Sequence, residues 1–178
     1  MSRRAVTIIE ATQRLSDHDP TFKWIDLFEQ EYTDLQLGEL ADCLLAHPDV
    51  VTHVWLGYNQ LTDETGVKLA RYLATSSTIK YMGLYNNQFG LGTYLALAAA
   101  LRVNSSLRWL YLNNNQLVDQ TRIDAAFVEA LRLNPVRPAG SDWALYSPGS
   151  NEFERLYSNA RSLGPPSMLE QLRHCDRT

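Results

Sequence analysis

The sequence repeats itself at a fixed spacing of 28 residues. The three clearest copies cover residues 51–61, 79–89 and 107–117, and they superimpose without a gap. Each copy follows the pattern L-x-x-L-x-L-x-x-N-x-L, with other apolar residues replacing some of the leucines. Self-similarity at a period of this length is typical of a solenoid, in which each repeat adds one turn to a shared core.

The spacing inside each copy predicts a short strand followed by a helix. Apolar residues at the fourth and sixth positions alternate with exposed ones, which is the period of a strand with one buried face. After each strand, an apolar helical pattern predicts a helix on the convex side. The asparagine at the ninth position can donate to and accept from the backbone of neighbouring turns, so Asn59, Asn87 and Asn115 are predicted to form a hydrogen-bonded ladder.

The repeat pattern divides the chain into a central array and two end segments. A spacing of 29 residues recovers a degenerate first unit, in which Gln30 replaces the asparagine. The predicted divisions are an N-terminal helical cap at 1–21, four repeats at 22–50, 51–78, 79–106 and 107–135, and a divergent C-terminal cap or appendage at 136–178. Within the appendage, residues 143–145 are a candidate strand and residues 151–163 a candidate helix.

These motifs resemble leucine-rich repeats, and the 28-residue period with a helical second half is similar to the ribonuclease-inhibitor-like class. The resemblance implies an α/β fold: a short right-handed leucine-rich-repeat solenoid with a concave parallel β-sheet and convex helices, capped at both ends. Such repeats occur in enzyme inhibitors, innate-immune sensors, actin-capping proteins and regulators of small GTPases, which all work by presenting a surface. The resemblance therefore implies a non-enzymatic protein–protein interaction module and leaves the partner open.

The composition limits the classes of partner. The chain has 178 residues, 45% of them hydrophobic, which is enough for an elongated core. Its formal charge of −4, without a basic run, argues against nucleic acid as a partner. No apolar segment is long enough to span a bilayer, and Glu10 ends the first apolar run too early for a signal peptide. We expect a cytoplasmic protein that is monomeric alone, or one in the host cytosol if it is a secreted effector.

Aromatic residues gather at the strand positions that the pattern predicts to face the concave side. Three of the four tryptophans of the chain lie there. Contiguous exposed aromatic residues usually mark a binding surface, and Trp and Tyr are enriched at interface hot spots. The predicted partner-binding residues are Trp24, Phe28, His53, Trp55, Tyr58, Tyr81, Tyr85, Trp109, Tyr111 and Asn113.

Three alternatives remain open for this face. In the first, the rings only pack against one another across adjacent strands and stabilise the sheet. In the second, the face recognises a small ligand or glycan. In the third, the chain is a structural component of a larger assembly. An inhibitor, an adaptor and an effector are all compatible with the preferred role in binding another protein.

Signs of catalysis are weak throughout the sequence. His18 lies between two aspartates, and residues 174–176 read His-Cys-Asp, but neighbours in sequence rarely face one another, so we expect a solvated turn and a solvated tail. We find no phosphate-binding glycine loop and no zinc-type spacing of Cys and His. The sequence predicts no enzyme activity, no cofactor and no metal site.

Overall fold

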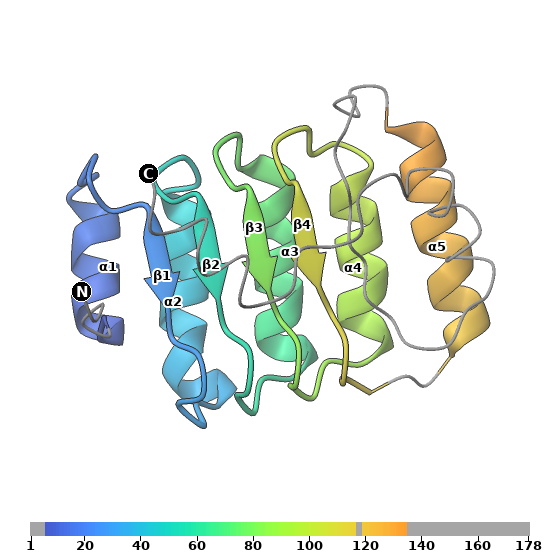
Figure 1. The fold of residues 1–178 in the computed structure, drawn as a ribbon, viewed down its shortest axis with the longest axis horizontal. Helices are drawn as coiled ribbons and strands as arrows, with labels where there is room; N and C mark the ends of the chain where they lie inside the picture. The colour runs from blue at the N-terminus through green and yellow to red at the C-terminus, as the bar shows by residue number, and fades with distance from the viewer. Residues whose placement is uncertain (1–5, 117–118, 135–178) are drawn as a thin grey trace, which may run out of the picture.

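The computed structural model describes residues 6–116 and 119–134, and the predicted strand at 143–145 and helix at 151–163 lie outside this part of the chain. Strands and helices alternate along the described residues (Figure 1). Among the described residues the longest helix has 14 residues, and none of the helices there is long and apolar enough to cross a bilayer. The elements are α1 (Ile8–Ser16), β1 (Trp24–Asp26), α2 (Asp34–Ala46), β2 (His53–Trp55), α3 (Asp63–Thr75), β3 (Tyr81–Gly83), α4 (Leu91–Leu101), β4 (Trp109–Tyr111) and α5 (Gln120–Leu133).

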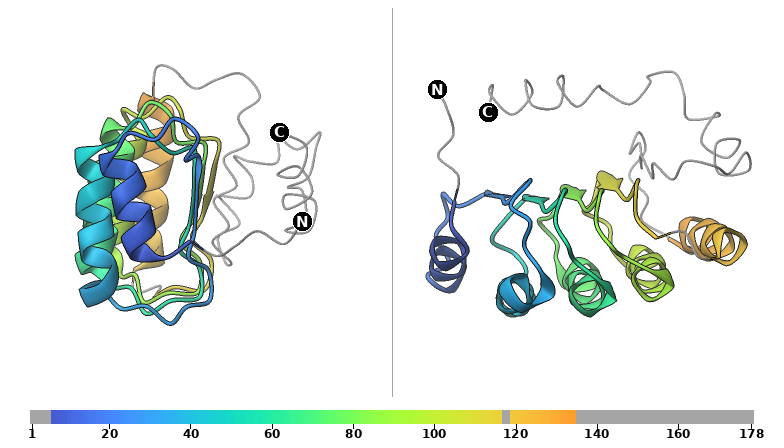
Figure 2. Two further views of the ribbon diagram at one scale, coloured as in Figure 1. Left: turned by 90° about the vertical axis from the view of Figure 1, so that its left-hand side faces the viewer. Right: turned by 90° about the horizontal axis from the view of Figure 1, so that it is seen from below.

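The four strands form one parallel sheet in the order β1-β2-β3-β4. The five helices of the described residues cover the same face of this sheet (Figure 2, left). Neighbouring strands are about 4.8 Å apart and packed helices about 8–10 Å apart. The helix layer is therefore wider than the strand layer, and the strand side is concave (Figure 2, right). This confirms an α/β fold with a parallel sheet on its concave side.

The core lies between the sheet and the helices. The central residue of each strand is fully buried: Ile25, Val54, Met82 and Leu110. Apolar helix residues such as Leu40, Leu69 and Leu97 are buried opposite them. In α1 the inward face consists of Ala11 and Leu15, whereas Ile9 is 81% exposed.

An asparagine ladder joins consecutive repeats, as the sequence predicted. Asn87 Nδ2 donates to the carbonyl of Leu56 in the preceding repeat at 2.9 Å, and its Oδ1 accepts from the N–H of Leu61 at 3.1 Å. Asn59 and Asn115 make the equivalent contacts with their own preceding repeats. Gln30 bonds only locally, to the carbonyls of Phe28 and Glu29. The asparagines thus fix the backbone of each turn to that of the next.

Further side chains join the ends of adjacent helices. The Asp63 carboxylate accepts from the N–H groups of Gly90 and Thr93, at 2.7 and 3.0 Å, at the start of the next helix. Burial disfavours the charged carboxylate, but hydrogen bonds from Thr93 and the backbone of Gly90 outweigh it, and the pKa of Asp63 is lowered. At the other helix end, Asn104 donates to the carbonyl of Leu73 at 2.7 Å. The stack of repeats is therefore held by polar contacts as well as by its core.

Candidate functional site: a concave aromatic face

The first row of rings crosses the whole sheet at the first residue of each strand. Strand pairing places Trp24, His53, Tyr81 and Trp109 side by side. The planes of successive rings are nearly parallel, at 13°, 9° and 9°, and their centroids are 3.4, 4.4 and 6.5 Å apart. Every repeat thus contributes one ring to a continuous stack on the concave side.

The second row depends on a glycine. Trp55 ends β2, and the residue paired with it in β3 is Gly83. A Cβ atom at Gly83 would lie 2.3 Å from Cε3 of Trp55, so the indole occupies the space above this glycine. It reaches across β3 to Tyr111 of β4, with ring centroids 5.9 Å apart. Gly83 therefore allows two large rings from non-adjacent strands to meet.

The third group of rings lies where the chain leaves the strands. Phe28 packs against Tyr58 with ring centroids 5.1 Å apart, and Tyr58 packs against Tyr85 at 5.7 Å. Tyr85 lies over Gly57, where an added Cβ would be 2.8 Å from the ring. The sequence predicted an exposed Tyr85, and this is wrong: its side chain is 7% exposed because the glycine beside it leaves room for the ring. Tyr58 is 47% exposed, so this ring of the group is accessible to solvent.

We define the concave aromatic face as the nine rings Trp24, Phe28, His53, Trp55, Tyr58, Tyr81, Tyr85, Trp109 and Tyr111. All nine make at least one ring contact with another member. Asn113, the tenth predicted residue, is half-buried beside them, and its carbonyl accepts from the N–H of Asn86 at 2.9 Å. The structure thus brings the predicted residues together, and adds Gly57 and Gly83 as the positions that make room for the rings.

The concave aromatic face combines apolar ring area with a few polar atoms. Burial raises the pKa of Tyr85 well above its usual range, and the nearby Tyr58 and Asp26 raise it further. The hydroxyl of Tyr85 thus stays protonated at neutral pH. His53 contacts the Thr52 hydroxyl through Nδ1 at 2.7 Å and is stacked between the rings of Trp24 and Tyr81. Together the rings offer apolar area edged by hydroxyl, imidazole and indole groups, which suits recognition by contact.

The fold matches known structures, whereas the sequence does not match known families. No protein-family model matches the chain, and no curated protein matches it by sequence. Leiomodin-1 actin-binding site 2 superimposes with a TM-score of 0.74 at 19% identity, covering 88% of each chain. The tropomodulin C-terminal domain of Caenorhabditis elegans superimposes with a TM-score of 0.75 at 14% identity, over 87% of this chain and 91% of the other. At sequence identities of 19% and 14%, the similarity shows only that the fold is shared.

The comparison corrects the class that the sequence predicted. The two matching structures named above are a leiomodin-1 actin-binding site and a tropomodulin C-terminal domain, and not the ribonuclease-inhibitor-like repeats that the sequence predicted. A 28-residue period with a convex helix follows from the geometry of a strand–helix turn, so unrelated chains can satisfy it. The period identifies the architecture, and it does not identify the class.

Proposed function

We propose that this chain is a non-enzymatic protein-binding module that holds its partner on the concave aromatic face, and that actin is the first partner to test. The main support for this proposal is the unbroken set of ring contacts across all four strands, together with the exposed Tyr58 at the edge of the concave aromatic face. Both matching folds support the choice of actin, since one is an actin-binding site of leiomodin-1 and the other a domain of tropomodulin.

The arrangement of the rings favours a protein over a glycan. Sugars stack on the open faces of aromatic rings, but the faces of His53 are covered by Trp24 and Tyr81, at 3.4 and 4.4 Å between centroids. The row therefore presents mainly ring edges. Four strands about 4.8 Å apart make a face only about 15 Å wide. A standard interface buries about 800 Å² on each side. A protein partner therefore inserts a narrow helix or loop and also contacts the loops that flank the sheet.

The proposed architecture is a short right-handed leucine-rich-repeat solenoid. Its four repeats occupy residues 22–50, 51–78, 79–106 and 107–135, with residues 1–21 and 136–178 as end segments. The regular alternation of strands and helices supports the repeat boundaries. We further propose that the module acts in the cytosol, where actin is found, and that it is monomeric on its own.

Binding to monomeric and filamentous actin tests the proposal. Tyr81→Ala and Trp109→Ala each remove one ring from the first row, and Arg71→Ala changes an exposed residue of α3 and serves as the matched control. A buried aromatic anchor contributes about 2 kcal/mol, which corresponds to about a 30-fold change in Kd. We expect at least one ring variant to lose this much affinity while the control binds like the wild type.

Two results would count against parts of the proposal. If the wild type binds neither form of actin, actin is the wrong partner. If binding is tight but both ring variants keep full affinity, the binding face lies elsewhere. Folding of each variant is checked by circular dichroism, so that a loss of affinity is measured on folded protein.

A further inference from the structure

Two histidines from consecutive helix ends meet at the surface near the start of the array. Nδ1 of His47, the C-cap residue that follows α2, lies 3.2 Å from Nε2 of His18, in the turn after α1. Their ring centroids are 4.6 Å apart and the rings are perpendicular. The sequence predicted only a solvated turn around His18. The sequence pattern did not indicate that His47, at the end of the next helix, lies beside it.

A hydrogen bond fixes which nitrogen of His18 is available. Nδ1 of His18 lies 3.1 Å from the carbonyl of Ser16. A carbonyl only accepts, so Nδ1 carries the proton and Nε2 presents a lone pair. Histidines that bind metals almost always donate their other N–H to a carbonyl, a carboxylate or water in this way. His18 therefore has the orientation and tautomer of a metal ligand.

We propose that His18 and His47 form a two-ligand site for a divalent transition-metal ion such as Zn²⁺ or Ni²⁺. Two nitrogens 3.2 Å apart, each about 2.0–2.1 Å from one ion, subtend an angle of about 103° at that ion, close to tetrahedral. Imidazole is a preferred ligand of these metals, whereas Mg²⁺ and Ca²⁺ prefer oxygen. On binding, the ion displaces the proton of His47 Nδ1, which goes to solvent or to the other nitrogen of that ring.

The surroundings of the pair favour a cation. His47 and His18 both lie at helix C-termini, where the negative end of the helix dipole stabilises positive charge. His18 is exposed and His47 half-buried, so a hydrated ion can reach them. No group of three or more His, Cys, Asp and Glu side chains that could hold a metal occurs within the described residues. The protein therefore supplies two ligands and water completes the shell.

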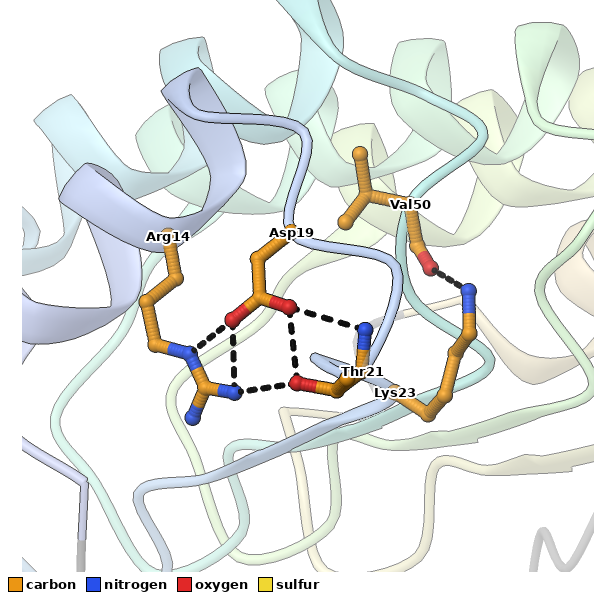
Figure 3. Close-up of polar contacts among 5 residues, drawn as sticks. All are labelled: Arg14, Asp19, Thr21, Lys23 and Val50. Carbon is orange, nitrogen blue, oxygen red and sulfur yellow. Dashed lines mark hydrogen bonds and ion pairs between the residues drawn. The ribbon is translucent and has the colours of Figure 1, made fainter.

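The turn that carries His18 is held in place by its neighbours. Asp19 accepts from the Thr21 hydroxyl at 2.7 Å and pairs with Arg14 at 2.8 Å (Figure 3). Hydrogen bonds from Thr21, with a further contribution from Arg14, lower the pKa of Asp19 to about 2. Lys23 also donates to the carbonyl of Val50, in the loop that follows His47, at 3.0 Å. These contacts hold the turn that contains His18 and the loop that follows His47.

The backbone at His18 allows a substitution that removes the imidazole without harming the fold. His18 has φ 50°, and the N–H of Asp19 bonds back to the carbonyl of Arg14, as in the helix ending that usually has glycine at this position. His18→Gly therefore suits the backbone and should keep or raise the melting temperature. Cys43→Ser, one helical turn before His47, is the matched control for metal binding through a thiol.

Calorimetric titration with Zn²⁺, Ni²⁺ and Mg²⁺ tests the site on the full chain. We expect the wild type to bind Zn²⁺ and Ni²⁺ but not Mg²⁺. His18→Gly and His47→Ala should each lose at least tenfold in affinity, whereas Cys43→Ser should not. As an independent readout, Ni²⁺ should raise the melting temperature of the wild type and leave that of His18→Gly unchanged. Equal affinity in His18→Gly, or no wild-type binding up to millimolar Ni²⁺, would overturn the proposal.

Discussion

Removing one asparagine of the ladder should destabilise the protein by an amount that the hydrogen bonds predict. In Asn87→Ala, the carbonyl of Leu56 loses the Nδ2 of Asn87 but keeps that of Asn59 at 3.0 Å. The carbonyl of Leu84 likewise keeps the Nδ2 of Asn115 at 3.0 Å. The N–H of Leu61 loses the side-chain acceptor that it contacts at 3.1 Å. One buried donor left without its acceptor costs about 1–3 kcal/mol, and this is the expected loss in the free energy of unfolding.

Asn87→Asp separates the donor and acceptor roles of the same side chain. The carboxylate keeps the acceptor for Leu61 but places negative charge near the carbonyls of Leu56 and Leu84, to which Asn87 donates. This raises the pKa of the new carboxyl in the folded state, so its destabilising effect grows as pH rises above the unfolded-state value of about 3.9. At pH 7 we therefore expect Asn87→Asp to be less stable than Asn87→Ala.

Urea unfolding followed by circular dichroism measures both variants. Gln88→Ala, at an exposed neighbouring position, is the control and should change stability by no more than about 0.5 kcal/mol. An Asn87→Ala protein that unfolds at the wild-type urea concentration would refute the ladder as a source of stability.

Three further predictions follow from particular contacts. Gly83→Ala should lower the free energy of unfolding by about 1–3 kcal/mol and change the near-UV signal of tryptophan, because the new Cβ overlaps the Trp55 ring; unchanged spectra and stability would contradict the packing. The pKa of Asp63 is lowered in the folded protein, so the stability that its carboxylate provides is complete above the unfolded pKa of about 3.9 and is lost as pH falls through the folded pKa. Asp63→Asn should therefore be less stable than the wild type at pH 7 and should lose less stability on acidification. If the stability of Asp63→Asn depends on pH as that of the wild type does, this prediction is wrong. Lys68→Ala should change stability by less than about 1 kcal/mol, because its 2.7 Å pair with Asp42 is partly exposed; a larger loss in urea unfolding would show that the pair is coupled to the core.

The regular parts of the fold were predictable because each repeat reports the same local environment. The fixed spacing placed Val54, Met82 and Leu110 in the core, and Asn59 and Asn87 in the ladder, before any contact was known. The concave positions of the rings followed from the same register. When the same position is apolar or Asn in several repeats, the shared feature predicts the structure more reliably than a single occurrence does.

The exceptions arise from contacts between one particular repeat and the next. Tyr85 is buried because its neighbour across the sheet is Gly57, and the apolar pattern of a single strand does not contain this information. The pairing of His18 with His47 also joins two units, although the spacing of 29 residues between them was a usable signal. Like residues one repeat apart occupy adjacent positions on the stack. Comparing side chains at the repeat spacing, and not only apolar positions, would have found this pair.

Hydroxyl-radical footprinting with and without bound actin tests the role of the concave aromatic face most directly. It reports, in one experiment, which side chains a partner covers. We expect Tyr58, Tyr81 and Trp109 to become protected in the complex, while Leu35 in α2 and Val103 after α4, which are 90% and 66% exposed, keep their rates of oxidation. Protection of Leu35 and Val103, with unchanged oxidation of the three rings, would contradict it.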